Sequence, residues 1–83
     1  MTPEELKKIE ANLVVDARGT ACPGPLLAAK KAIGDLESGE IMEILSADEG
    51  TKHDIPRWCD KVGHDYLGFT DLDSYTRLFL RKA

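Results

Sequence analysis

The chain between residues 13 and 25 reads Leu13-Val14-Val15-Asp16-Ala17-Arg18-Gly19-Thr20-Ala21-Cys22-Pro23-Gly24-Pro25. The apolar, β-branched run at 13–17 predicts a strand. Arg18-Gly19-Thr20 predicts a turn, and an amphipathic segment then runs over 25–37 until Ser38-Gly39 stops it. The apolar residues of that segment share one helical stripe: Leu26, Ala29, Ile33 and Leu36. We therefore expect a strand, a turn and a helix, with Cys22 at the start of the helix.

The rest of the chain adds a strand, a helix and a hairpin. Residues 40–47 (EIMEILSA) predict a second strand. A second helix follows, because apolar residues recur at i, i+3, i+4 and i+7 before Gly63: Ile55, Trp58, Cys59 and Val62. Residues 65–70 and 75–81 predict two further strands, joined by a turn at 71–74.

The start of the second helix has two alternatives. Thr51 could cap it, with Asp54 three residues later as in a capping box. Asp54 could instead be the cap, with Pro56 in the first turn. We favour the second alternative, because a proline further inside the helix would remove a backbone donor.

The order β-α-β-α-β-β predicts an α/β (α+β) two-layer sandwich with a four-stranded mixed sheet. Both helices should cover one face, and the first two strands should be parallel with a right-handed crossover. The other face should be largely open and could serve as a contact surface through four residues: Met42, Ile44, Tyr75 and Phe79.

A chain of 83 residues is expected to form a single domain, 1–83. Its core should span 12–82, and residues 1–11 should form an N-terminal extension. Thr2-Pro3-Glu4-Glu5 resembles a helix start, so a short helix is expected over about 3–11.

The composition of the chain argues against several classes of function. A net charge of −4 does not favour direct nucleic-acid binding. No stretch approaches the ~18–20 apolar residues of a membrane span, and the charged N-terminus lacks the apolar region of a secretory signal. A cytoplasmic location is therefore expected. The two cysteines and two histidines show neither C-x-x-C nor H-x-x-x-H spacing, so we expect no metal and no cofactor.

Cys22 is the candidate nucleophile. Pro23 disfavours helical backbone geometry at Cys22, which should place it in a cap position near free N–H groups and the positive end of the helix dipole. A thiol there ionises readily, and the same field would stabilise an anionic persulfide. The prolines should stiffen the chain, and Gly24 should leave room beside the sulfur.

Several alternatives stay open at this point. Cys22 could be a small apolar loop residue, or it could work with a histidine, His53 or His64. Cys59 lies on the apolar stripe beside Trp58, where a thiol is usually inert, although it could act as a resolving thiol.

Two segments resemble the TusA/SirA sulfur-carrier family. Asp16-Ala17-Arg18-Gly19 followed by Cys22-Pro23-Gly24-Pro25 is similar to its D-x-x-G-x-x-C-P-x-P element. The run from Asp54 to Cys59 with Gly63-His64 resembles its second helix and helix exit. The resemblance covers about residues 12–82 and implies the same β-α-β-α-β-β sandwich.

The resemblance also implies a function. Cys22 would accept sulfane sulfur as a persulfide and pass it on, supported by the motif residues Asp16, Gly19, Pro23, Gly24 and Pro25. Donors would be a cysteine desulfurase or a rhodanese, and the acceptor a DsrE-like relay protein. The relay could serve tRNA thiolation, sulfur oxidation or cofactor sulfuration. Such a protein is a carrier in a relay rather than a stand-alone enzyme. The alternative is a redox-sensing or regulatory interaction domain without sulfur transfer.

Overall fold

The computed structural model describes residues 2–21 and 23–83. Its elements follow the predicted order, but the N-terminal helix ends at Lys7 rather than near residue 11, and the last part of the predicted 25–37 segment forms a 3₁₀ turn. They are α1 (Pro3–Lys7), β1 (Leu13–Asp16), α2 (Gly24–Ala32), the 3₁₀ turn η1 (Ile33–Asp35), β2 (Ile41–Ser46), α3 (Thr51–Val62), β3 (Asp65–Asp71) and β4 (Thr76–Arg81). No helix within the described ranges is long and apolar enough to cross a membrane.

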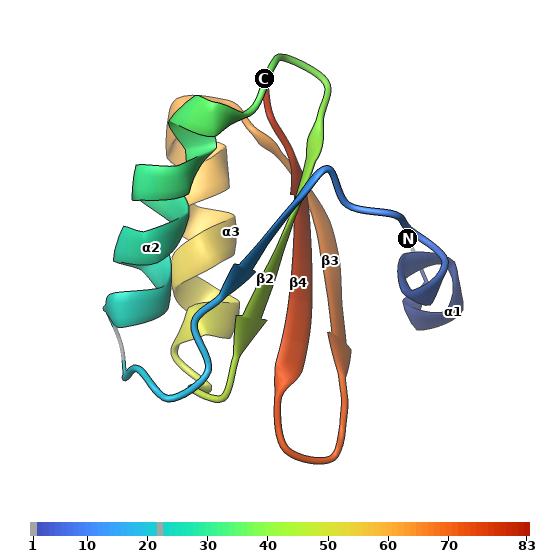
Figure 1. Cartoon of the computed structure of the whole chain (residues 1–83), viewed down its shortest axis with the longest axis vertical. Coiled ribbons are helices and arrows are strands. Elements are labelled where there is room, and N and C mark those ends of the chain that lie inside the picture. The colour runs from blue at the N-terminus through green and yellow to red at the C-terminus, as the bar shows by residue number, and fades with distance from the viewer. Residues whose placement is uncertain (1, 22) are drawn as a thin grey trace.

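The sheet has the strand order β1-β2-β4-β3. β1 pairs with β2 in parallel, as predicted, and β4 pairs antiparallel with both β2 and β3. Figure 1 shows α2 and α3 side by side on one face of this sheet. The expected mixed sheet with two helices on one face is therefore confirmed.

The main core lies between the sheet and these two helices. Met42 and Ile44 of β2 are fully buried there, and they pair with Leu80 and Leu78 of β4. Ile55 of α3 packs in the same cluster. The prediction that Met42 and Ile44 lie on the open face is wrong. β2 carries apolar residues in both alternating sets, so its sequence alone did not reveal which set turns inward.

The opposite face is covered in part by α1, which lies across the sheet from α2 and α3 (Figure 1). α1 packs against β3, and its Leu6 is only 1% exposed. Phe79 points to this second face because it pairs with Glu43 rather than with a core residue of β2, and it is fully buried. The Arg77 guanidinium lies over the Phe79 ring and forms a bidentate ion pair with the Glu43 carboxylate. This face is therefore less open than the sequence suggested.

α3 begins at Thr51 with Gly50 as its N-cap, which corrects the favoured start at Asp54 and leaves Pro56 inside the helix. The cause is a set of contacts across the preceding loop. The Thr51 hydroxyl pairs with that of Ser46 at 2.8 Å, and both residues are buried. The Asp48 carboxylate accepts the Gly50 N–H at 2.7 Å. These bonds fix the first turn, and the helix tolerates the donor missing at Pro56.

Leu6→Ala tests whether α1 is part of the folded unit. Deleting a buried leucine side chain typically removes 2–5 kcal/mol, so we expect the free energy of unfolding to fall by at least about 2 kcal/mol. Leu27→Ala is the matched control, because Leu27 is also helical but 57% exposed. Urea unfolding followed by circular dichroism measures both. Equal, small losses for the two variants would show that α1 adds nothing to stability.

Candidate functional site

The β1–α2 connection holds all the predicted site residues. Cys22 itself lies outside the described residues, and its neighbours on both sides define the frame around it. The connection begins where the Ala17 N–H donates to the Leu45 carbonyl of β2, at 2.9 Å. It turns at Gly19, whose φ of +95° is a backbone conformation that favours glycine. It ends at Pro25, which is fully buried at the start of α2.

The backbone closes tightly across position 22. The Gly24 N–H donates to the Ala21 carbonyl at 2.7 Å, and the Leu27 N–H donates to the Pro23 carbonyl at 3.0 Å. The N-cap of α2 is Pro23, so the sequence places Cys22 one residue before the cap rather than at it. Gly24 has spent its donor and Pro25 has none. Neither Gly24 nor Pro25 therefore offers a free N–H at the start of α2, and the positive field there comes from the helix dipole.

Gly24 lies against Thr20, a contact that the sequence did not predict. A Cβ at this position would lie 2.9 Å from the Cβ of Thr20 and 3.0 Å from its hydroxyl. Thr20 thus lies where a Gly24 side chain would be, and the predicted room beside the Cys22 sulfur lies outside the described residues. Thr20 is held in turn by its hydroxyl, which donates to the Ala17 carbonyl at 2.8 Å. The sequence predicted Thr20 only as part of the turn; a threonine directly after a turn glycine was the available signal for this bond, because its hydroxyl can reach the nearby backbone.

Asp16 supports the turn through Arg18. The guanidinium donates to both carboxylate oxygens, at 2.9 and 2.7 Å, and the Arg18 backbone N–H adds a bond of 3.1 Å. Hydrogen bonding from the Arg18 side chain lowers the pKa of Asp16 to about 2. The guanidinium also lies 4.8 Å from the centre of the Tyr75 ring. Asp16 therefore ties the connection to the start of β4, and its carboxylate stays ionised at neutral pH.

A second loop lies beside the connection. Residues 19–21 share a shallow hollow of about 280 Å³ with Ala47 and Asp48, which follow β2. Because β1 and β2 are parallel, both loops leave the sheet at the same edge, where α/β proteins commonly bind their ligands. The region next to Cys22 in the chain is therefore an open surface that another protein can reach.

Other candidate groups have different environments. Cys59 is 1% exposed in the main core, and burial raises the pKa of its thiol to about 11. His64 lies against the Trp58 ring, with 5.2 Å between centroids, and its Nδ1 accepts the Ala83 N–H. His53 is exposed on the first turn of α3. No group of three or more His, Cys, Asp or Glu side chains among residues 2–21 and 23–83 is arranged to hold a metal ion.

Taken together, the fold and the connection define a class. This is a small α+β protein with two parallel helices on one face of a mixed sheet, whose β1–α2 connection carries Cys-Pro-Gly-Pro. A sequence model of one family, described as "Sulfurtransferase TusA", matches residues 13–82. The chain belongs to this TusA family, and the sequence-based resemblance is confirmed.

Individual relatives agree with this assignment. The chain is 43% identical over 70 residues to a "Putative sulfur carrier protein" of Archaeoglobus fulgidus, covering 84% of this chain and 96% of that protein. It is 42% identical over 75 residues to the "Putative sulfur carrier protein YrkF" of Bacillus subtilis, covering 90% of this chain and 40% of that longer protein. A crystal structure of a SirA-like protein from Desulfitobacterium hafniense superposes with a TM-score of 0.74 at 22% identity, over 83% of this chain and 95% of that one. The structural likeness supports the fold.

Gly24→Ala tests the close approach of Thr20. The new methyl group would clash with the Thr20 side chain, so we expect a loss of about 1–3 kcal/mol in the free energy of unfolding. Gly34→Ala is the control, because a Cβ there meets nothing within 4 Å and should be neutral or stabilising. The loss at Gly24 should shrink in a Thr20→Gly background. An equal loss in both backgrounds would contradict the contact.

Thiol labelling tests the difference between the two cysteines. With a pKa of about 11, only about 0.1% of Cys59 is thiolate at pH 8, and its side chain is buried. We expect iodoacetamide to label the wild type quickly at one thiol, and Cys22→Ser only after unfolding in guanidinium. Mass spectrometry of timed samples measures this. Comparable labelling rates in folded wild type and folded Cys22→Ser would contradict the assignment of Cys22 as the reactive thiol.

Proposed function

We propose that this chain carries sulfane sulfur as a persulfide on Cys22 within a protein relay. The observation that carries the proposal is the family match over residues 13–82, a range that includes Cys22. The curated relatives are named as sulfur carriers, and their names fit the same role.

The chemistry balances without a further reagent. The Cys22 thiolate attacks the outer sulfur of a donor persulfide, and one S–S bond forms as another breaks. The donor leaves as a thiolate, and Cys22 keeps the outer sulfur. Delivery repeats the exchange, with a thiolate of the acceptor attacking the sulfur on Cys22. No net oxidation or reduction takes place in either step.

The frame around position 22 suits a carrier. The positive end of α2 favours the thiolate before loading and the anionic persulfide after it. The Asp16–Arg18 pair, the Thr20–Gly24 contact and buried Pro25 keep the connection in one shape. Asp16, Gly19, Pro23, Gly24 and Pro25 therefore act in this proposal as positioning residues for Cys22.

The proposal also covers the partner proteins and the cellular location of this chain. A carrier of this family needs a protein that supplies sulfur and one that receives it. We assign the supply to a cysteine desulfurase or a rhodanese, and the receipt to a DsrE-like relay protein. A cytoplasmic setting suits the chemistry, because both cysteines must stay reduced. We treat residues 1–83 as one functional unit in which α1 adds stability.

Mass spectrometry after sulfur loading tests the function. Incubation of the reduced protein with a purified cysteine desulfurase and L-cysteine should add about 32 Da, the mass of one sulfur atom, to the peptide that contains Cys22. Cys59→Ser should gain the same mass, and Cys22→Ser should gain none. Dithiothreitol should remove the addition.

The redox-sensing alternative predicts a different result. Peroxide would then oxidise Cys22, and no donor would add sulfur to it. An absence of the 32 Da gain with a desulfurase, a rhodanese and inorganic polysulfide would overturn the carrier proposal.

A further inference from the structure

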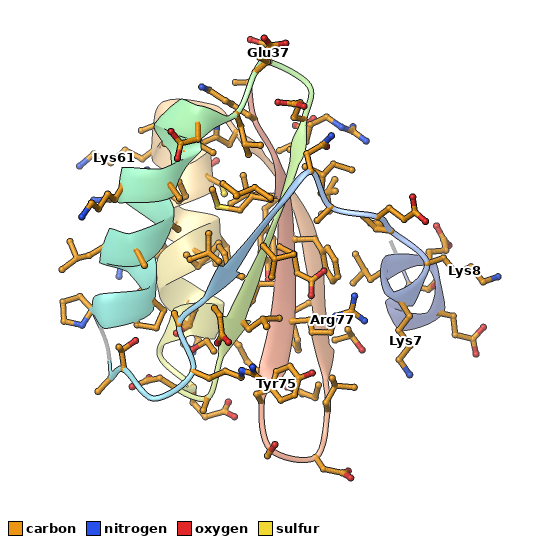
Figure 2. All side chains as sticks on the ribbon, in the orientation of Figure 1. Lys7, Lys8, Glu37, Lys61, Tyr75 and Arg77 are labelled. Carbon is orange, nitrogen blue, oxygen red and sulfur yellow. The ribbon has the colours of Figure 1, made fainter. Side chains whose placement is uncertain are left out.

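A groove lies between the two parallel helices, and its lining starts at Leu26 in the first turn of α2. Its volume is about 230 Å³, and Leu26 and Trp58 supply its apolar surface. Three cationic side chains and one acidic one complete its walls: Lys30 from α2, and Asp54, Arg57 and Lys61 from α3. Figure 2 shows Lys61 pointing away from the sheet on the helical side of the molecule.

The three cations of this groove have no ion pair or hydrogen bond with any residue in the described part of the chain. Elsewhere the basic side chains are often engaged. Arg18 pairs with Asp16, Arg77 pairs with Glu43, and Lys52 binds two carboxylates. Asp54, the one acid of the groove, is itself engaged. A chain with a net charge of −4 therefore places three cations, none of them in a salt bridge with a described residue, and one carboxylate around a single hollow, whose lining carries a formal net charge of +2.

The size and composition of the groove limit what it can hold. Pockets for small-molecule ligands usually measure about 300–1,000 Å³, so a hollow of about 230 Å³ suits one or two side chains of a protein surface. Its apolar floor suits an apolar side chain, and its cationic rim suits carboxylates around that side chain.

We propose that this groove, formed by Leu26, Lys30, Asp54, Arg57, Trp58 and Lys61, docks an acidic segment with an apolar anchor on the sulfur-donor protein. The inference rests on the proposed function and deepens it, because it assigns the recognition of the donor to a surface distinct from the reacting sulfur. The sign of the groove's charge selects an acidic partner and opposes a basic one.

The position of the groove allows docking and transfer at the same time. Lys30 lies six residues after Gly24 on α2, which is about 9 Å along the helix axis. A protein interface of about 800 Å² per partner is roughly 30 Å across. A donor that fills the groove therefore also covers the start of α2, which Cys22 precedes by two residues in the sequence.

Charge reversal separates docking from chemistry. The groove variant Lys30→Glu with Lys61→Glu is compared with a control of equal charge change, Lys7→Glu with Lys8→Glu. Lys7 is the last residue of α1 and Lys8 is its C-cap, and Figure 2 shows both on the other side of the sheet. All four side chains are exposed, so both variants should fold.

Sulfur loading of Cys22 is followed by mass spectrometry with two donors. One is a purified cysteine desulfurase with L-cysteine, and the other is inorganic polysulfide, which needs no docking. We expect the groove variant to lose at least about tenfold in kcat/KM with the desulfurase and to keep wild-type rates with polysulfide. The control should stay within about twofold of wild type with both. Raising the salt from 50 to 500 mM should shrink the difference, because salt screens the docking charges.

The other outcomes are equally decisive. If the wild type takes sulfur from both donors and the groove variant matches the control, docking at the groove is wrong and the carrier function stands. A loss of the same size with polysulfide would show that the groove affects Cys22 itself, which also overturns docking. If wild type takes sulfur from neither donor, the proposed function fails. Salt-sensitive RNA binding by the wild type that only the groove variant loses, with unchanged loading by the desulfurase, would assign the groove to nucleic acid instead.

Discussion

The parallel pairing of β1 with β2 is the constraint on which the rest of the structure depends. Parallel neighbours need a crossover, and α2 provides it on one face of the sheet. The pairing also brings the loops after β1 and β2 to the same edge, where Ala21 and Asp48 line one hollow. Because α3 follows β2 as α2 follows β1, the two helices run in the same direction. The functional connection and the groove between the helices are both products of this single pairing.

The sequence predicted the elements well, because each one has its own periodicity and its own end signal. What it missed depends on contacts between distant residues. The start of α3 is set by the Ser46–Thr51 hydroxyl pair, which no local pattern shows. The inward face of β2 was ambiguous because Met42 and Ile44 alternate with Ile41 and Leu45, which are also apolar. Only the register with β4 and the position of the helices decide between the two sets.

In the candidate site, too, the sequence reveals the motif residues but not the contacts that form only in the folded chain. A cysteine before a proline at a helix start can be found by inspection, and so can the glycine of the turn. The role of Gly24 could not be found this way, because its neighbour Thr20 approaches through the folded turn. Asp16 is the opposite case, because its partner Arg18 is only two residues away in the sequence. Motif residues identify the site, and their mutual contacts explain its shape.

The net charge of the chain hides an uneven distribution of its basic side chains. The overall charge of −4 argues against nucleic acid, but it says nothing of where the positive charges lie. Arg18 and Arg77 form ion pairs within the fold. The hollow between the helices is lined by three cations that have no ion pair with a described residue: Lys30, Arg57 and Lys61. A carrier must release its partner after each transfer, so recognition by exposed charges suits it: such contacts speed encounter more than they prolong the complex. The sulfur chemistry requires one reactive thiol, and the choice of donor can be encoded on the neighbouring helices.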